Sequence, residues 1–209
     1  MKNMNIYVYK MVVDNGGAPC VSKGLLTLAI CKPMIRKMAK LNSLVFGFGG
    51  KDYGDKLIYI AVVTGKLSKK EYYIEPEYAQ RPDCIYKVTN GKPEIKGNAR
   101  FHKGGDQLKH DVGFKFERAF VLLSTDFRYL GKKGNIDYQK RFQQVAELVN
   151  KMKRGHRVNH SAETYAQLLE LKEQVWRIYP RNFNGKPTDS DLSKLCNDAS
   201  GSCRCQTLD

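Results

Sequence analysis

Apolar residues in the first 130 positions form short runs that are rich in β-branched and aromatic side chains, a pattern typical of strands. The clearest runs cover residues 6–13, 43–50 and 56–63. The last two are joined by a short loop that contains Asp52, Gly54 and Asp55, so we expect them to pair as a hairpin. A further strand is expected at 116–124, and residues 127–130 are expected to continue it past a bulge.

A different spacing begins after residue 136, where apolar residues recur every three or four positions. A helix over 137–152 would carry on one face Tyr138, Phe142, Val145, Val149 and Met152. A second helix is predicted over 161–179 and is ended by Pro180. Two short helices are expected earlier, one at 68–73 and one that begins at Lys32 or Pro33, because proline fits the first turn of a helix.

Glycine and proline punctuate residues 75–113, which predicts a long irregular segment of a kind that is usually functional or mobile. The sequence becomes polar after residue 181, where we expect the chain to fray. We therefore predict an α+β protein with a single domain over 1–187. Its sheet-forming part covers about 5–135, its C-terminal helices cover about 137–179, and a polar tail covers 188–209.

The chain is strongly basic, with 36 Lys and Arg against 21 Asp and Glu and a formal net charge of +15. Such a balance favours a polyanionic partner, with nucleic acid first, although excess lysines also serve to solvate a surface. The start of the chain lacks a signal-peptide pattern, and no apolar run approaches the roughly 20 residues that span a bilayer. We therefore expect a soluble, cytoplasmic protein without a membrane partner.

Six cysteines are spread too unevenly for the disulfide framework of a small secreted domain, so we interpret them as reduced thiols. The three tail cysteines, Cys196, Cys203 and Cys205, have no matching second pair or nearby histidine, and we expect them to be dispensable. The glycines of 47–50 lie between two predicted strands, which excludes a dinucleotide-binding fingerprint. No metal and no cofactor is expected.

Lys32 and Arg36 are four residues apart, so on a helix they share a face on which a guanidinium and an ammonium suit a phosphate. Like charges at this spacing are also common on solvated faces. Cys31 precedes them, and a thiol among cations at the start of a helix can become a nucleophile. A buried structural thiol is the alternative interpretation of Cys31.

The segment 101–111 concentrates two of the four histidines, His102 and His110, with Asp106 and Asp111. Imidazole and carboxylate groups together can act as acid and base, recognise a base or sugar, or bind a divalent metal. Their spacing matches no zinc motif, and a polar loop also produces such a grouping by chance. His102, His110 and Asp111 join Cys31 as candidate catalytic residues.

Two further groups of residues suit a nucleic-acid ligand. Arg154, His156 and Arg157 follow the predicted helix 137–152, where they can contact backbone phosphates or offset the helix dipole. Tyr53 and Tyr129 neighbour glycines and charged residues and are candidates for stacking on a nucleotide base, although most aromatic residues near strands lie in the core.

Several segments in their order along the chain resemble one family: TLAICKPMIRKMAK, LVFGFGG, KLIYIAVVTGKLSKKEYY, FHKGG, KHD, FVLLSTDFRYLG and RGHR. The chain resembles the second of the nucleotide-modification-associated domain families over about residues 7–187. The most specific part is the block that contains Leu28, Cys31, Pro33 and Arg36. The resemblance implies a role in making, recognising or processing modified bases, and it supplies no reaction.

The strand order with its glycine-containing hairpin also resembles the PUA-like barrels, some of which read modified bases in DNA or RNA. The resemblance therefore implies a PUA-like mixed β-barrel over about 5–135 with flanking helices. We therefore expect the protein to bind or recognise a nucleotide or modified base. The alternative is an enzyme that modifies a nucleotide or base with a His/Asp loop, and the third interpretation is a basic protein-interaction module. The partner is expected to be a nucleotide or nucleic acid, in particular modified DNA. The oligomeric state is left open.

Overall fold

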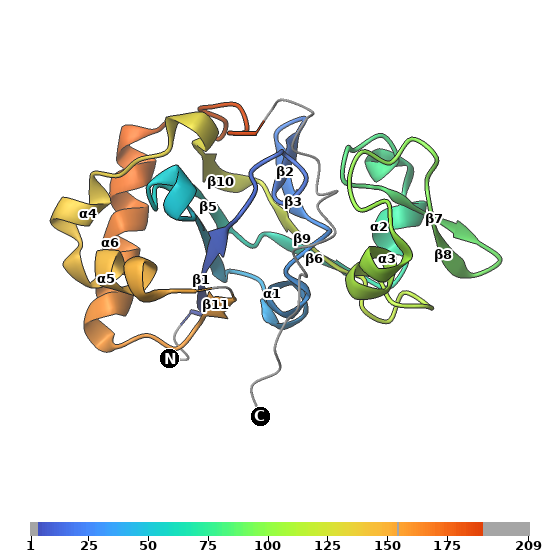
Figure 1. The fold of residues 1–209 in the computed structure, drawn as a ribbon, viewed down its shortest axis with the longest axis horizontal. Helices are drawn as coiled ribbons and strands as arrows, with labels where there is room; N and C mark the ends of the chain where they lie inside the picture. The colour runs from blue at the N-terminus through green and yellow to red at the C-terminus, as the bar shows by residue number, and fades with distance from the viewer. Residues whose placement is uncertain (1–3, 154, 190–209) are drawn as a thin grey trace.

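The computed structural model describes residues 4–153 and 155–189, which form a mixed α+β fold with several sheets. Figure 1 shows α4, α5 and α6 on one side of the larger sheet, α2, α3, β7 and β8 at the opposite end of the molecule, and α1 between them. The predicted α+β class is confirmed.

The larger sheet has five strands in the order β10-β5-β4-β1-β11. Their bounds are Asp126–Tyr129 (β10), Leu57–Val62 (β5), Leu44–Gly49 (β4), Ile6–Met11 (β1) and His156–Arg157 (β11). β1 and β4 run parallel, with Ile6 opposite Leu44, while the other neighbouring pairs are antiparallel. The predicted β4–β5 hairpin and the predicted mixed sheet are therefore confirmed.

Successive side chains along the inner strands of this sheet point alternately into two cores, so both faces of the sheet are buried. Ile6 and Val8 face the helices α4 (Tyr138–Arg141), α5 (Gln143–Lys151) and α6 (Ala162–Ile178), whereas Tyr7 and Tyr9 face the second sheet. The predicted helix 137–152 is interrupted at Phe142, whose φ of −120° and ψ of 73° are not helical. Phe142 stays buried at this break beside Tyr138 in the same core. Burial of the two side chains is thus kept although the backbone leaves the helical conformation between them.

The second sheet has four antiparallel strands in the order β2-β3-β9-β6. Their bounds are Cys20–Ser22 (β2), Leu25–Leu28 (β3), Phe120–Ser124 (β9) and Gly65–Ser68 (β6). The prediction that residues 127–130 continue the preceding strand is wrong, because β9 and β10 belong to different sheets. The chain turns at this corner, where the Ser124 hydroxyl donates to the carbonyl of Asp126 at 2.9 Å. The sheets of the described residues do not close into a barrel, so the PUA-like barrel is not confirmed.

Residues 75–113, predicted to be irregular, contain regular elements. They hold the hairpin β7 (Tyr86–Thr89) and β8 (Lys92–Ile95), helix α3 (Gly105–Asp111), and a short 3₁₀ turn at Pro76–Tyr78. Together with α2 (Glu71–Ile74) they surround a third core that includes Tyr72, Tyr86 and Phe101. Short elements separated by glycine and proline give a weak periodic signal, which explains why the sequence pattern missed them.

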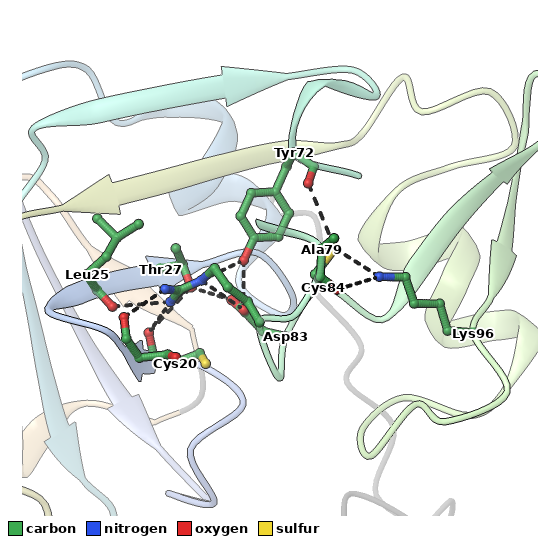
Figure 2. Close-up of polar contacts among 10 residues, drawn as sticks. Cys20, Leu25, Thr27, Tyr72, Ala79, Asp83, Cys84 and Lys96 are labelled. Atoms are coloured by element: carbon green, nitrogen blue, oxygen red, sulfur yellow. Dashed lines mark hydrogen bonds and ion pairs between the residues drawn. The ribbon is translucent and has the colours of Figure 1, made fainter. Parts of the chain in front are cut away.

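A buried arginine, Arg81, joins this third core to the second sheet, because its Nε donates to the Tyr72 hydroxyl at 3.1 Å. Figure 2 shows Tyr72 and Asp83 beside Thr27 of β3. The Arg81 guanidinium donates to the carbonyls of Cys20, Ser22 and Leu25 at 2.9–3.2 Å. Asp83 is fully buried and accepts hydrogen bonds from the hydroxyls of Tyr72 and Thr27. Since every one of these polar groups has a partner, the network ties the β2–β3 hairpin to the segment after α2.

The polar segment after residue 181 is held against the larger sheet up to the last described residue. Tyr129 donates its N–H to Asn182 and accepts one from Asn184, and the Asp189 N–H donates to the carbonyl of Asp14 at 2.8 Å. The expectation that residues 182–189 fray is wrong, because backbone pairing with the edge strand β10 needs no apolar side-chain pattern. Cys196, Cys203 and Cys205 lie outside the described residues.

Gly47 of β4 sits where two strands approach closely, and we expect Gly47→Ala to lower the free energy of unfolding by about 1–3 kcal/mol. A Cβ atom there would lie 2.2 Å from the Tyr59 ring and 3.0 Å from the Met11 sulfur. The ring cannot move freely because the Tyr59 hydroxyl is hydrogen-bonded to Tyr9 at 2.9 Å inside the core. Urea unfolding measures the loss. Gly97→Ala, with open space at its Cβ, is the control, and equal losses would contradict the packing argument.

Candidate active site

Cys31 lies at the corner between β3 and helix α1 (Pro33–Met38), and its backbone is strained. Cys31 and Lys32 have φ angles of 58° and 43°, in the left-handed region that non-glycine residues rarely adopt. Such conformations cost on the order of 1–3 kcal/mol each and cluster at functional sites. The corner is held in place by two hydrogen bonds: the Cys31 N–H donates to Asp111 at 2.8 Å, and Arg36 donates to the Cys31 carbonyl at 2.6 Å.

A thiol, an imidazole and a carboxylate meet at this corner. The Cys31 Sγ lies 3.3 Å from Nε2 of His102, and Nδ1 of His102 lies 2.5 Å from Oδ2 of Asp111. Cys31 is half-buried, His102 is 8% exposed and Asp111 is fully buried. A nucleophile in contact with a base that a carboxylate orients in turn is the arrangement of covalent catalysis in many hydrolases and transferases.

The Asp111 carboxylate is ionised and determines the tautomer of His102. Burial alone would raise the pKa of Asp111. The hydrogen bond and charge of His102, the charge of Arg36 and the hydrogen bond from Tyr86 outweigh burial and hold that pKa below its ordinary value. An ionised carboxylate only accepts hydrogen bonds, so Nδ1 of His102 is the donor to Oδ2. In the neutral imidazole, Nε2 is then the basic nitrogen, and it is the one that faces the thiol.

Arg36 is fully buried and serves as an internal support for the site. Its Nε, NH1 and NH2 groups donate to the carbonyls of Cys31, Phe120 and Asp111 at 2.6, 2.7 and 2.9 Å. NH2 also lies 3.7 Å from the Asp111 carboxylate. The guanidinium that was expected to bind phosphate is therefore directed into the protein, where it joins the segments that carry Cys31 and Asp111.

The other candidates do not join the thiol. His110 follows in α3 and is half-buried, and burial lowers its pKa. The Tyr53 hydroxyl hydrogen-bonds to the carbonyl of Val12 at 3.0 Å and to the carboxylate of Asp189. Tyr129 is 1% exposed, and its hydroxyl donates to Asp14 at 2.6 Å. Both tyrosines thus hold the segment up to residue 189 against the sheet, in place of the expected stacking surface.

The structure brings two predicted binding groups close to each other. The Lys32 ammonium lies 4.9 Å from the centre of the Tyr9 ring, and Tyr9 pairs in register with His156 of β11. Burial lowers the pKa of His156, and the charges of Lys32 and Arg157 lower it further. Arg157 is exposed and donates to the carbonyl of His156 at 3.1 Å, while Arg154 lies outside the described residues.

Tyr86 was not singled out from the sequence, although its hydroxyl donates to Asp111 at 2.8 Å. It belongs to the short hairpin that the pattern missed, so no sequence signal pointed to it. Within residues 4–153 and 155–189, no cluster of three or more His, Cys, Asp or Glu side chains is suited to hold a metal ion. The same residues contain no helix with the length and apolar character that a bilayer span requires.

The site thus combines a thiol, an imidazole and a carboxylate in an α+β fold, and comparison with known families shows to which family the chain belongs. Residues 3–194 match the model of nucleotide modification associated domain 2, so the chain belongs to that family. Its description indicates an association with nucleotide modification. No curated protein and no solved structure gives a significant match.

Proposed function

We propose that this protein is an enzyme that modifies a nucleotide or a nucleic-acid base, with Cys31 as the nucleophile, His102 as general acid and base, and Asp111 as the group that orients His102. The contact that carries the proposal is the one between Cys31 Sγ and His102 Nε2 at 3.3 Å, backed by the buried Asp111. The family's association with nucleotide modification supplies the substrate class.

The geometry suits transfer of an acyl group. His102 Nε2 takes the thiol proton while the sulfur attacks a carbonyl carbon of the substrate, and a C–S bond forms. The bond from that carbon to the exocyclic nitrogen of the base then breaks, and His102 returns the proton to the nitrogen. Water, deprotonated by His102, attacks the thioester and releases a carboxylic acid and the free thiol. Asp111 stays ionised and stabilises the imidazolium at each step.

Charge supports a polyanionic substrate. The net charge of +15 favours DNA that carries a modified base over a neutral small molecule. Lys32, next to the nucleophile, is proposed to contact a phosphate, and Arg157 is proposed to contact the backbone of longer nucleic acid. Arg36 is left out of the ligand set because its N–H groups are used by three carbonyls.

The test is to trap and map the acyl-enzyme. Wild-type protein is mixed with an oligonucleotide that carries N-acylated cytosine or adenine, quenched in acid and analysed by mass spectrometry of the intact protein and its peptides. We expect the mass of one acyl group on Cys31 and release of the unmodified base. Cys31→Ser should lose the thioester, and His102→Asn should slow base release by about 10²–10⁴-fold.

Two outcomes would contradict the proposal. One is base release that Cys31→Ser leaves unchanged. The other is tight binding of the oligonucleotides without turnover or adduct in the wild type, which would favour a reader of modified bases. Lys37→Gln, an exposed change on α1, controls for loss of surface charge.

A further inference from the structure

The corner that carries Cys31 also directs the ammonium group of Lys32 toward Tyr9 of β1. Cys31 and Lys32 are consecutive, and both act on Tyr9: burial raises the pKa of Tyr9, and Cys31 is among the nearby groups that raise it further, so the thiol and the ammonium both lie near this ring. The Lys32 ammonium lies over Tyr9, 4.9 Å from the ring centre. His156 comes to the same place from β11, opposite Tyr9 in register, and its ring centre is 6.0 Å from that of Tyr7.

Neither Lys32 nor His156 has an acidic partner among the described residues. The charge of Asp14 is one of the causes that raise the pKa of Tyr9, after the larger effect of burial. Lys32 forms no ion pair with any of their carboxylates. The titratable and charged groups around His156 are Lys32, its neighbour Arg157, and Tyr7 and Tyr9 of β1. Lys32 and Arg157 both lower the pKa of His156, after the larger effect of burial. A half-buried pair of a cation and an imidazole without a counter-charge favours an anion.

We propose that Lys32 and His156 form a subsite for one phosphate of the nucleotide whose reactive group is attacked by Cys31. The inference rests on the proposed function, and it unites two residues that the sequence had assigned to separate binding surfaces. Lys32 supplies a fixed positive charge. His156 supplies a hydrogen bond and takes up a proton when the phosphate arrives, because an adjacent anion favours the charged imidazole.

The experiment follows the imidazole of His156 by NMR during pH titrations, with inorganic phosphate and with a nucleoside 5′-monophosphate. We expect either ligand to raise the pKa of His156 and the nucleotide to bind more tightly than free phosphate. Lys32→Gln should weaken nucleotide binding about tenfold, and it should raise the pKa of His156 in the unbound protein because a repelling charge is lost. His156→Asn should weaken nucleotide binding as well.

Lys37→Gln is the matched control, since Lys37 is an exposed lysine on the same helix. Equal weakening by Lys32→Gln and Lys37→Gln would overturn the subsite, because it would reduce the effect to general surface charge. Equal affinities for inorganic phosphate and the nucleotide would overturn the assignment to a nucleotide phosphate.

The subsite and the thiol chemistry are tested separately. Cys31→Ser should keep nucleotide binding and the titration of His156, so the subsite stands even where no acyl-enzyme forms. Lys32→Gln should keep a reactive Cys31 thiol, so an unchanged nucleotide affinity in that variant would contradict the subsite and leave the proposed nucleophile intact.

Discussion

Replacing His102 by asparagine is expected to slow alkylation of Cys31 by iodoacetamide at pH 7 about tenfold, because the thiolate is the attacking species and His102 is the group that accepts the thiol proton. The contact distance of 3.3 Å permits direct transfer. Alkylation is followed by mass spectrometry of the Cys31 peptide between pH 5 and 10. The variant should react appreciably only in the alkaline range, where an unassisted thiol ionises.

His110→Asn is the control for this result. His110 lies in α3 next to Asp111, and its side chain makes no hydrogen bond or ion pair within the described part of the chain. Its replacement should leave the alkylation rate within about twofold of the wild type. A His102→Asn variant that reacts as fast as the wild type at pH 7 would contradict the proposed pairing, and so would equal slowing by both substitutions.

Arg36→Met is expected to lower the free energy of unfolding by about 3–5 kcal/mol, because it removes a buried charge whose partners stay behind. The Asp111 carboxylate would lose its cation, and three backbone carbonyls would lose a donor. Urea unfolding measures the change. Lys37→Met, on the exposed side of α1, should alter the same quantity by less than about 0.5 kcal/mol.

The pH dependence of the same measurement provides a second check. The pKa of Asp111 is lower in the folded protein than in the unfolded chain, so this residue contributes stability that is present above the unfolded pKa and is lost as the pH falls. Wild-type stability should therefore fall below about pH 5, and Arg36→Met should show a smaller fall. If Arg36→Met lowered the free energy of unfolding by no more than Lys37→Met does, the guanidinium of Arg36 would not hold the site together.

The amino-acid pattern by itself determined the local elements whose signal is contained in a few neighbouring residues. Ser161 accepts a hydrogen bond from the Thr164 N–H at 3.2 Å at the start of α6, as the predicted boundary at 161 requires. Pro33 opens α1, and β4 and β5 pair as a hairpin across a short loop. Family membership was also recoverable, because the ordered motifs are spread along most of the chain.

Only the tertiary structure decided the site. Cys31, His102 and Asp111 were each candidates, but no spacing rule predicts that residues 71 and 80 positions apart meet within hydrogen-bond distance. The direction of Arg36 was undetermined for a related reason, since a six-residue helix is too short for its apolar face to show which cation is buried. The left-handed corner at Cys31 and Lys32 depends on hydrogen bonds from α1 and to α3, so only the assembled fold supplies the energy that maintains it.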